Sequence, residues 1–463
     1  MNNRCITLNE LRQARWAVLG FGREAQALVR VMKARWPDCA IHVYCEQTPT
    51  LADDLPFSVQ NDDNETGDQL HVGPFEHTDF DHYQVLVKSP GISPLHPGLI
   101  DLPESIPVTS TTNLWFAERP DQRVIAITGS KGKSTTSALL HHVLQYSGVK
   151  ARLVGNIGLP LIEQLEAQAD CWVLELSSYQ TRDLQACAEV GVVLSLFPDH
   201  LDWHGGEHAY FRDKLKLLNC CKQPWIPQDL RPAIVHWMPE WQQPDQAPPL
   251  VDILTEAGIH PGKLGVMDGD QCLMPTYELP LVGAHNLRNL CVAWTLARYW
   301  GISDQEIRSA VGHFQALPHR LQNLGPIGPH VFINDSISTT PQASIAALSA
   351  FSGIPTTILI GGHDRGVDWS EFADYVAQQA PQAIIAMGAH GRRIVAVLEA
   401  RACEALKSRV HWAENLSQAV SLARQVSVSG SYIVLSPGAP SYGEFANFEA
   451  RGHAFKVCAE QSR

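Results

Sequence analysis

The sequence has little positive charge, no long hydrophobic run and no Cys-x-x-Cys pair. Its 463 residues carry a formal net charge of −13 and no block of Lys and Arg, which argues against a nucleic-acid partner because such binding needs clustered positive charge. No hydrophobic run approaches the roughly 20 residues of a membrane span, and the first ten residues lack the hydrophobic core of a signal peptide. The eleven cysteines, without a Cys-x-x-Cys pair, indicate free thiols in a reducing compartment. These absences predict a cytoplasmic protein.

The sequence does contain a strand, a glycine-rich turn and the start of a helix between residues 125 and 136. The turn reads Thr128-Gly-Ser-Lys-Gly-Lys-Ser-Thr135, where backbone N–H groups, a helix N-terminus and an ammonium group converge. It is not the common phosphate loop, because Ile127 stands where that motif requires glycine. We expect Lys133 to reach the phosphates of ATP and the Ser134 hydroxyl to bind Mg²⁺. The alternative is a glycine-rich loop without a ligand.

A second glycine pattern follows the predicted strand Trp16–Leu19. Residues 20–25, Gly-Phe-Gly-Arg-Glu-Ala, match the dinucleotide-binding fingerprint, and the next strand ends at Glu46. The pattern alone suggests NAD, but the pyrophosphate of a UDP group satisfies it equally well. The strand Val85–Lys88 then enters a Pro/Gly loop around Gly91, at the edge where such sheets bind ligands. A plain turn is the alternative for this loop.

Polar side chains follow two further predicted strands. The strand Trp172-Val-Leu-Glu175 ends in a carboxylate, which is a suitable ligand for a metal ion near phosphates. A strand at residues 192–196 runs into His200, Asp202 and His204. These three residues are candidate metal ligands, and an ordinary polar loop is the alternative.

Two linkers divide the chain, whose length suits about three domains. Pro120 and Asp121 mark the first linker, and residues 317–322 mark the second. Short strands alternate with helical patterns, which predicts parallel sheets. Residues 220–280, rich in Trp, Pro and Gln, predict no clear element. We therefore predict three α/β domains in series.

A series of short motifs extends over nearly the whole chain. In chain order they are Thr128-Gly-Ser-Lys-Gly-Lys-Ser-Thr135, Gly155-Asn-Ile-Gly158, Leu174-Glu-Leu-Ser-Ser-Tyr-Gln180, Asp199-His200, His285-Asn286, Pro318-His-Arg320, Asn334-Asp-Ser336 and Phe445-x-x-Phe448-x-x-Arg451-Gly452. Together they resemble the Mur ligases, the ATP-dependent enzymes that add amino acids to the UDP-muramoyl precursor of bacterial peptidoglycan.

The resemblance implies a fold and a set of partners. The implied domains are a Rossmann-like, UDP-binding domain at residues 1–119, a central P-loop ATPase-type domain with a parallel or mixed sheet at residues 120–317, and a Rossmann-like, amino-acid-binding domain at residues 318–463. Within the family the chain most resembles the ligases that join glutamate to UDP-N-acetylmuramoyl-L-alanine. We therefore expect a monomer that binds these two molecules and ATP, with no nucleic acid and no membrane span.

The resemblance also implies a mechanism. ATP would convert the alanyl carboxylate into an acyl phosphate, which the glutamate amine attacks through a tetrahedral intermediate. These species are anionic, which fits two Mg²⁺ ions in an acidic protein. Ser134 and Glu175 would hold one ion, and Glu175 and His200 the second. Lys214 matches a lysine that the family carbamylates with CO₂, a reaction that needs a neutral, partly desolvated amine.

By resemblance, each group of candidate site residues has one role. The catalytic residues are Lys133, Glu175, His200 and Lys214, and the metal ligands are Ser134, Glu175, His200 and carbamylated Lys214. The ATP-binding residues are Gly129, Ser130, Lys131, Gly132, Lys133, Ser134, Thr135, Asn286, Asn289, Arg320 and Asp335. The UDP-substrate residues are Gly22, Arg23, Glu24, Glu46, Gly91, Asn156 and Ser177, and the glutamate residues are Thr339, Arg365, Ser441, Tyr442 and Phe448.

The chain departs from the family at the glutamate site. D-Glutamate-adding members carry lysine after Asn-Asp-Ser, where Ile337 stands, and a second lysine position resembles Arg365. An apolar side chain and a planar guanidinium cannot hold two carboxylates as two ammonium groups do. These differences resemble a variant subgroup that adds L-glutamate and leaves inversion to a later epimerase. The same ligation with D-glutamate is the alternative, and Tyr442 and Phe448 could instead be core aromatics.

Three other functions compete with this interpretation. An NAD-linked oxidoreductase rests on residues 20–25 alone and leaves the phosphate loop without a role. A nucleotide sensor without catalysis would have no reason to keep Glu175, His200 and Lys214 together. A folylpolyglutamate synthase shares the pattern of the ATP domain, but the Gly20-x-Gly22 turn speaks against it.

Overall fold

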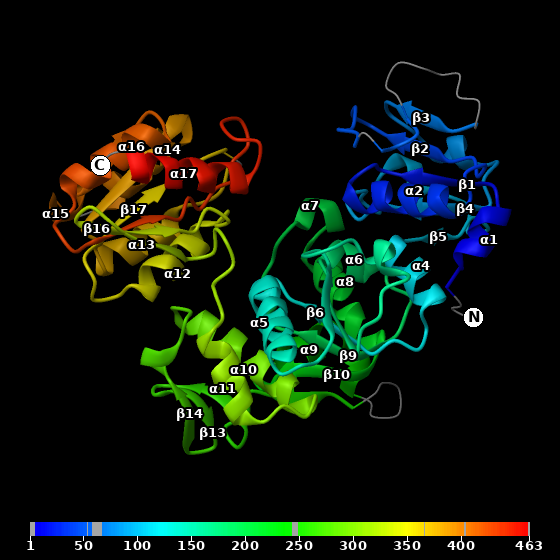
Figure 1. The fold of residues 1–463 in the computed structure, drawn as a ribbon. Helices are drawn as coiled ribbons and strands as arrows, with labels where there is room; N and C mark the ends of the chain where they lie inside the picture. The colour runs from blue at the N-terminus through cyan, green and yellow to red at the C-terminus, as the bar shows by residue number, and fades with distance from the viewer. Residues whose placement is uncertain are drawn as a thin grey trace. The chain divides into compact units, whose positions relative to one another are not determined.

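The computed structural model describes residues 5–52, 54–57, 67–242, 249–364, 366–401 and 404–461. It divides into two compact units, one of Met1–Thr276 with Arg288–Val311 and one of Tyr277–Leu287 with Gly312–Arg463. Figure 1 shows both as sheets flanked by helices. The predicted α/β class is confirmed, because three large sheets are parallel or mixed.

The first sheet has five parallel strands in the order β3-β2-β1-β4-β5. Its central strands β1 and β4 are buried and mostly apolar, as parallel strands are when helices cover both faces. The strands are β1 (Trp16–Leu19), β2 (His42–Cys45), β3 (Gln69–Val72), β4 (Val85–Lys88) and β5 (Val108–Thr109). The helical elements are α1 (Leu8–Gln13), α2 (Arg23–Arg35), η1 (His77–Phe80), α3 (Pro97–Ile100) and α4 (Thr111–Glu118).

The second sheet has six parallel strands in the order β11-β10-β9-β6-β8-β7. The strands are β6 (Val124–Thr128), β7 (Ala151–Gly155), β8 (Cys171–Glu175), β9 (Ala188–Val193), β10 (Cys221–Pro227) and β11 (Val251–Ile253). The helical elements are α5 (Lys133–Tyr146), η2 (Leu161–Gln164), α6 (Ser178–Asp183), α7 (Leu201–His204), α8 (Glu207–Asn219), η3 (Gln228–Leu230), α9 (Arg231–Trp237), η4 (Pro239–Gln242), η5 (Thr276–Glu278), α10 (Ala284–Tyr299) and α11 (Asp304–Gly312).

A small antiparallel sheet completes the first unit. Its strands are β12 (Ile259–Gly262), β13 (Gly265–Asp268) and β14 (Gln271–Pro275). This sheet, together with β10, α9 and β11, occupies the stretch of residues 220–280 for which the sequence predicted nothing. The strands of the small sheet are short and only partly buried, and β10 contains Pro224 and Pro227, so neither periodicity nor composition identified them.

The strand predicted at residues 192–196 was wrong in its extent. β9 ends at Val193, and residues 194–196 leave the sheet. Leu194 N still donates to Thr128 O, whereas Ser195 turns to the glycine-rich loop and accepts from Lys131 N through its Oγ at 2.9 Å. The last residues of the apolar run at 192–196 therefore contact the phosphate loop and are not part of β9.

One hydrophobic core joins the two large sheets of the first unit. It includes Leu28 of α2 and Trp172 of β8, which are both fully buried. The ring of Trp115 in α4 meets the Trp172 ring edge-on, with centroids 5.0 Å apart. At the rim of this core, Arg30 of α2 and Glu163 of η2 form an ion pair at 2.6 Å. The two sheets are thus parts of one packed body.

The second unit is built on a mixed sheet in the order β15-β16-β20-β17-β18-β19, in which only the β15–β16 pair is antiparallel. Leu359 of β17 packs with α16 and α17, whereas Ile358 and Ile360 pack with α12, α13 and α14, as the two-residue period of a strand requires. The strands are β15 (Gln322–Ile327), β16 (His330–Asn334), β17 (Thr356–Ile360), β18 (Ala383–Met387), β19 (Val410–Ala413) and β20 (Tyr432–Leu435). The helices are α12 (Pro341–Ala350), α13 (Ser370–Gln378), α14 (Gly388–Arg401), α15 (Glu404–Lys407), α16 (Leu416–Val426) and α17 (Phe448–Gln461).

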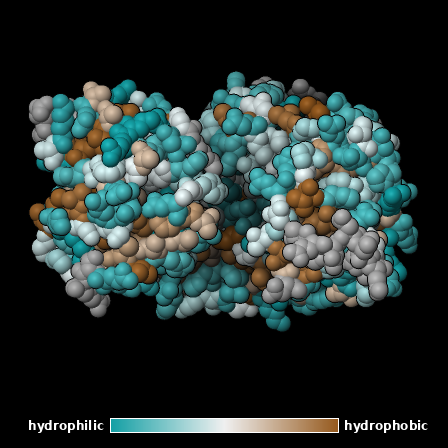
Figure 2. Space-filling view, turned by 90° about the horizontal axis from the view of Figure 1, so that it is seen from above, coloured by the Kyte–Doolittle hydropathy of each residue, from teal (hydrophilic) through white to brown (hydrophobic). Residues whose placement is uncertain are grey.

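The surface is mainly hydrophilic on the face shown in Figure 2, where hydrophobic residues occur singly or in small groups. The most exposed large apolar side chains are Tyr277, at 85%, and Leu264, at 64%. Within the described ranges, no helix is both long and apolar enough to cross a membrane.

Gly452 in α17 lies against the ring of His319. A Cβ atom at position 452 would lie 2.1 Å from His319 Nδ1, and that ring is held by Asn334, whose Nδ2 is 3.0 Å from the same nitrogen. We predict that Gly452→Ala destabilises the second unit by about 1–3 kcal/mol through overpacking, although alanine is the better helix former. Thermal unfolding followed by circular dichroism measures the effect.

The matched control is Gly312→Ala at the end of α11, where a Cβ atom would meet nothing within 4 Å. We expect this variant to be as stable as the parent protein or slightly more stable. A Gly452→Ala protein that unfolds at the parent temperature would contradict the packing argument.

Candidate functional site

The turn between β6 and α5 has the geometry of an anion-binding loop. Gly132, immediately before α5, has a left-handed φ of 88°, and a Cβ atom there would lie 2.4 Å from Asn289 Oδ1. Only glycine therefore fits this position. Because glycine has no side chain with which to cap α5, the first N–H groups and the positive end of the helix dipole are directed into the loop.

A neighbouring segment supports this turn. Phe197 N donates to Ser130 Oγ at 2.9 Å, and the same oxygen lies 2.7 Å from the Tyr210 hydroxyl. Lys131 Nζ lies 3.7 Å from Asp199 Oδ2. The Ser130 side chain is therefore occupied within the protein, and so is its backbone, since Ser130 N donates to Ser195 O at 3.0 Å and Ser130 O accepts from Lys133 Nζ at 3.3 Å. Ser130 supports the shape of the turn, and its predicted contact with ATP stays a prediction.

Two lysine side chains meet at one backbone oxygen. Lys133 Nζ donates to Gly129 O at 2.8 Å, and Lys214 Nζ from α8 donates to the same oxygen at 3.2 Å. Burial, together with the nearby Lys133, lowers the pKa of Lys214 well below its usual value. A neutral amine in this position can react with CO₂, so the residue fits the predicted carbamylation.

Glu175 ends β8 beside the phosphate loop and is fully buried. Its Oε1 accepts from Asn156 Nδ2 at 2.7 Å, whereas its Oε2 is buried with no hydrogen-bond partner among the described residues. A buried carboxylate oxygen without a partner is unfavourable unless a ligand satisfies it. This atom therefore fits a Mg²⁺ ion, which together with the Ser134 hydroxyl it would hold next to the phosphates.

His200 precedes α7 with a left-handed φ of 51°, a conformation that in a residue other than glycine often marks a functional position. Burial lowers the pKa of His200, which favours the neutral imidazole that binds metal ions. Of the two other candidate ligands, His204 is buried against Asp213, at 2.6 Å, and Asp202 is exposed. No group of three or more His, Cys, Asp or Glu side chains suited to a metal ion occurs in the described ranges.

The predicted UDP-binding turns lie side by side in the first unit. Ser89 Oγ donates to Gly20 O at 2.8 Å, which joins the loops after β4 and β1. The Arg23 side chain reaches the second sheet and donates to Gly155 O at 2.8 Å and to Asn156 O at 3.3 Å. The loop containing Asn156 is thus attached to the start of α2.

The other predicted UDP-binding side chains have partners within the protein. Glu24 accepts from Thr111 Oγ1 at 2.7 Å and from Gln180 Nε2 at 2.5 Å, and burial raises its pKa. Glu46 lies 3.3 Å from His96 Nε2, and Ser177 caps α6. The side chain of Glu24 therefore joins the two sheets, and only its backbone is left to meet a pyrophosphate.

Two of the predicted ATP-binding residues line one cavity in the second unit. Asn286 and Arg320 border a cavity of about 320 Å³, together with apolar residues such as Phe314 and Phe351. Asn289, by contrast, belongs to the first unit, beside Gly132. The backbones on both sides of Arg320 are left-handed, with φ of 62° at His319 and 44° at Leu321.

Asp335 is the buried carboxylate that supports this cavity. Its Oδ1 accepts from Leu321 N at 3.1 Å, and its Oδ2 accepts from Ser436 Oγ at 2.8 Å and from the Ser338 hydroxyl. Burial raises the pKa of Asp335 to about 6 in spite of these hydrogen bonds. The residue thus fixes the strained backbone next to Arg320. Sequence reasoning did not identify Ser338, which contacts Asp335 within a local turn, or Ser436, which the pairing of β20 with β16 brings to Asp335.

The predicted glutamate residues that the structure describes lie on two loops of the second unit and at the start of α17. Thr339 is exposed, Ser441 is buried, and Tyr442 is 56% exposed with its ring 6.4 Å from that of His363. Phe448 begins α17 and contacts the ring of His319, 6.0 Å away. Arg365 lies outside the described residues. The exposure of Tyr442 argues against the alternative that it is a core aromatic.

Arg451, which the sequence showed only as part of a motif, organises the loops around this region. It is 2% exposed and donates to Ser336 O at 2.7 Å, to Ser336 Oγ at 3.0 Å and to Ala439 O at 3.0 Å. Burial lowers the pKa of Arg451 to about 10. The Arg451 guanidinium thus donates to oxygens of the loop after β16 and of the loop after β20, and it holds the two loops together.

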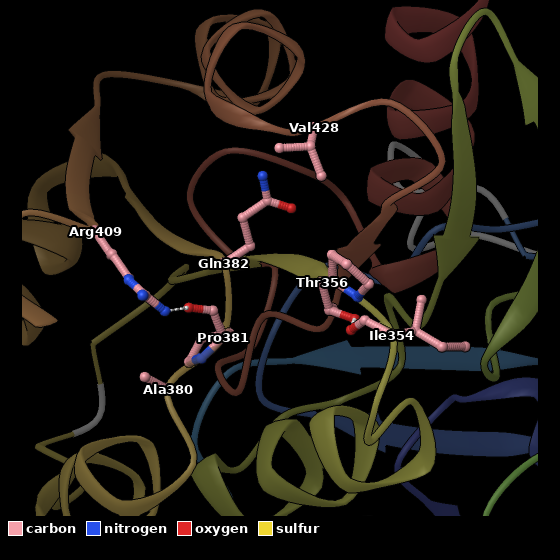
Figure 3. A pocket seen from close by; sticks show the side chains of 8 residues that line it. Ile354, Thr356, Ala380, Pro381, Gln382, Arg409 and Val428 are labelled. Carbon is pink, nitrogen blue, oxygen red and sulfur yellow. Dashed lines mark hydrogen bonds between the residues drawn. The ribbon is translucent and has the colours of Figure 1, made fainter.

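A larger cavity of about 480 Å³ lies elsewhere in the second unit, lined among others by Thr356, Gln382 and Arg409. Figure 3 shows Arg409 with its guanidinium at Pro381 O, to which it donates at 3.1 Å. Thr356 begins β17 and Gln382 precedes β18, so this cavity lies at the amino ends of the strands. Ligands of such sheets bind at the carboxyl ends, and none of the predicted site residues lines it.

A parallel sheet with a phosphate loop, a buried lysine beside it and an unpaired carboxylate oxygen define a nucleotide-using α/β enzyme. The Mur ligase middle domain family matches residues 127–228. UDP-N-acetylmuramoyl-L-alanine--L-glutamate ligases of Xanthomonas axonopodis pv. citri and Xanthomonas euvesicatoria pv. vesicatoria are 39% and 40% identical to the chain, each over 98% of the chain and 97% of the relative. The UDP-N-acetylmuramate-alanine ligase MurC of Thermotoga maritima shares the fold, with a TM-score of 0.58 at 16% identity over 97% of this chain and 100% of that one. The chain belongs to the Mur ligase family.

The titration of Asp335 gives a prediction for stability. A carboxyl whose native pKa is raised to about 6 favours folding most at acid pH, and this contribution is lost as the pH rises through 6. We therefore predict that Asp335→Asn gains on the order of 2 kcal/mol relative to the parent protein between pH 4 and pH 7, because the amide cannot ionise. Denaturant unfolding at each pH measures the difference.

Asp368→Asn is the control, since the hydrogen bonds of Ser370 lower the pKa of this exposed carboxyl. Its difference from the parent protein should stay constant above pH 5. A constant difference for Asp335→Asn as well would show that Asp335 does not titrate in this range.

Proposed function

We propose that the protein is an ATP-dependent, ADP-forming ligase that adds L-glutamate to UDP-N-acetylmuramoyl-L-alanine during peptidoglycan precursor synthesis. The observation that carries the proposal is the convergence of Lys133 and Lys214 on Gly129 O. This arrangement places two amines, one of them with a lowered pKa, at a phosphate loop. Relatives that are similar over nearly their full length are named for this reaction.

The reaction balances in two steps. An oxygen of the alanyl carboxylate attacks the γ-phosphorus of ATP, and the bond to the β-phosphate oxygen breaks to release ADP. The glutamate amine then attacks the acyl carbon, phosphate leaves, and the nitrogen loses its proton. Lys133 stabilises the negative charge on the transferred phosphoryl group.

The residues fit two Mg²⁺ ions, which would neutralise phosphate charge and polarise the transferred group. Ser134 and Glu175 would hold one ion, and Glu175, His200 and carbamylated Lys214 would hold the other. Carbamylation would convert an amine, which cannot bind Mg²⁺ in its charged form, into an anion that can. The low pKa of Lys214 and the unpaired Oε2 of Glu175 support this assignment.

The substrates would be divided among the three proposed domains. Residues 1–119 would bind the UDP end, residues 120–317 the triphosphate, and residues 318–463 the glutamate, with Asn286, Arg320 and Asp335 supporting the nucleotide. The paired loops at Gly20 and Ser89 and the cavity at Arg320 support these assignments. We further propose a cytoplasmic monomer whose L-glutamyl product is consumed by an epimerase.

The choice of L-glutamate rests on the residues that replace two family lysines. Ile337 is half-buried and apolar, so it cannot pair with a carboxylate. The names of the relatives carry the same stereochemistry, in agreement with the prediction from the sequence.

The decisive assay offers purified protein each glutamate enantiomer with UDP-N-acetylmuramoyl-L-alanine, ATP and Mg²⁺. We expect ADP and a UDP-linked dipeptide from L-glutamate only, because the apolar Ile337 removes one carboxylate partner that D-glutamate uses in the family. Lys133→Ala is the negative control and should lose turnover by at least about 10³-fold. Consumption of D-glutamate would reverse the stereochemical assignment, and no ADP with either enantiomer would refute the ligase.

Lys214 gives a separate prediction. Lys214→Ala should lower kcat at least about 100-fold, because a Mg²⁺ ligand is lost, and added formate or acetate should restore part of the rate by entering the vacated space. Steady-state ADP release measures both effects. The control is Lys222→Ala, an exposed lysine of β10, which should turn over normally. Full activity of Lys214→Ala without added carboxylate would remove the carbamate from the mechanism.

A further inference from the structure

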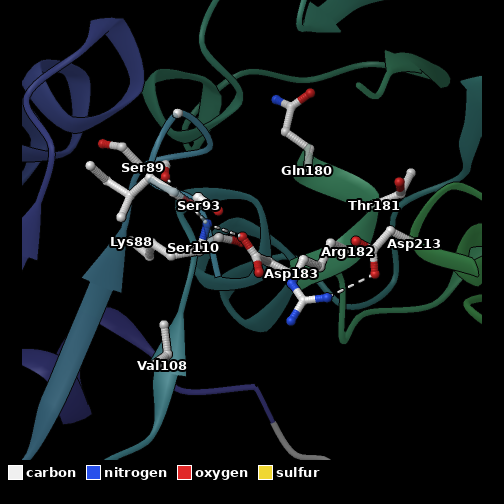
Figure 4. Close-up of polar contacts among 12 residues, drawn as sticks. Lys88, Ser89, Ser93, Val108, Ser110, Gln180, Thr181, Arg182, Asp183 and Asp213 are labelled. Carbon is white, nitrogen blue, oxygen red and sulfur yellow. Dashed lines mark hydrogen bonds and ion pairs between the residues drawn. The ribbon is translucent and has the colours of Figure 1, made fainter. Parts of the chain in front are cut away.

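The loop after β4 is fixed by an ion pair with the second sheet. We call residues 89–95 the β4 loop. Lys88 is 3% exposed, and its Nζ donates to Ile92 O at 2.9 Å and to Ser89 O at 3.4 Å. The same ammonium pairs with Asp183 Oδ2, at the end of α6, at 2.7 Å (Figure 4). The three hydrogens of the ammonium thus have three oxygen acceptors, and none is left for a ligand.

The helix α7 holds the β4 loop at a second point. Trp203 Nε1 donates to Gly91 O at 2.9 Å, and Ser93 Oγ donates to Trp203 O at 2.6 Å. The Lys88 ammonium lies 5.4 Å from the centroid of the Trp203 ring, within reach of a cation–π attraction. The end of β4, the loop that follows it and the distant helix α7 are therefore bonded into one cluster.

The end of α6, which carries Asp183, is held in place by contacts with α4 and α8. Asp183 O accepts from Asn113 Nδ2 at 2.8 Å. The neighbouring Arg182 pairs with Asp213 of α8 at 2.9 Å, as Figure 4 shows. Asp213 directly precedes Lys214. Asp183 is thus a fixed point, and the position of Lys88 is determined by the sheet that carries the phosphate loop.

These contacts decide which polar groups of the β4 loop face a ligand. Carbonyl oxygens repel a diphosphate, whereas backbone N–H groups attract it. The carbonyls of Ser89, Gly91 and Ile92 are all occupied by donors within the protein. If the Lys88 and Trp203 donors were removed, the carbonyls of Gly91 and Ile92 would be free to turn toward the ligand, whereas Ser89 O would keep its hydrogen bond from Ile92 N.

We propose that Lys88 and Trp203 are positioning residues for the sugar-nucleotide substrate, which hold the carbonyls of the β4 loop away from its diphosphate. The inference rests on the proposed function, in which the first sheet binds the UDP end. Lys88 acts through the loop and through Asp183 without touching the substrate. The UDP site is therefore built in part by the ATP-binding sheet.

The test compares three variants for binding of UDP by calorimetry and for steady-state kinetics. Lys88→Met keeps the length of the side chain and removes its charge, and Trp203→Phe removes a single N–H donor and keeps an aromatic ring. We expect both to raise the Kd for UDP and the KM for UDP-N-acetylmuramoyl-L-alanine, about 10- to 100-fold for Lys88→Met and severalfold for Trp203→Phe. The kcat and the KM for ATP should stay within about twofold, since the phosphate loop is untouched.

The matched control is Arg30→Met. Arg30 also joins the first and second sheets by an ion pair, with Glu163 at 2.6 Å, but it does not contact the β4 loop. Its Kd for UDP should equal that of the parent protein. If Arg30→Met weakens UDP binding as much as Lys88→Met does, the effect belongs to the docking of the sheets and the proposal is wrong. If Lys88→Met fails to fold, Trp203→Phe decides, and unchanged UDP binding in that variant overturns the proposal.

Failure of the proposed function is distinguishable from failure of this inference. A parent protein that binds UDP but forms no ADP would refute the ligase and leave the binding comparison valid. A parent protein that binds neither UDP nor the UDP-linked precursor would overturn both. If Lys88→Met lowers kcat but leaves the KM for UDP-N-acetylmuramoyl-L-alanine and the Kd for UDP unchanged, Lys88 acts in the chemical step. That result would overturn its role in substrate positioning.

Discussion

The negative charge of a triphosphate is the constraint that organises the first unit. The chain carries a net charge of −13, yet its phosphate loop combines a helix N-terminus with two lysines on one carbonyl oxygen. Burial, and after it the repulsion by the neighbouring Lys133, lowers the pKa of Lys214 well below its usual value. A positively charged side chain suited to a phosphate and an amine of lowered pKa therefore meet at the same backbone oxygen.

The two large sheets of the first unit are joined by contacts at their carboxyl ends as well as by their core. The two sheets share one hydrophobic core. Side chains that follow the strands of one sheet can therefore contact loops of the other. Arg23 and Glu24 of α2 reach the second sheet, while Asp183 and Trp203 of the second sheet hold the loop after β4. The sites proposed for UDP and for ATP are thus built from common parts, which suits a reaction that joins a UDP-linked carboxylate to a phosphoryl group.

The second unit uses buried charge for a different purpose. Asp335 and Arg451 are both buried, and neither is paired with an opposite charge as its main partner. Each is satisfied by hydroxyl groups, backbone N–H groups or carbonyl oxygens of loops at the carboxyl edge of the sheet. Buried polar groups of this kind favour one loop arrangement over others, because any rearrangement leaves a charge without partners.

The sequence by itself determined the local features. Apolar β-branched runs predicted β1, β4, β6, β18 and β20, and the Gly-Lys-Ser-Thr order predicted the phosphate loop, because strand burial and glycine geometry are encoded within a few residues. Motif order predicted the family. The sequence could not predict that Ser130 and Glu24 use their side chains inside the protein, that the pKa of Lys214 is lowered, or that Lys88 pairs with Asp183. Those outcomes depend on burial and on partners between 67 and 156 positions away in the chain, which only the packing of the sheets brings together.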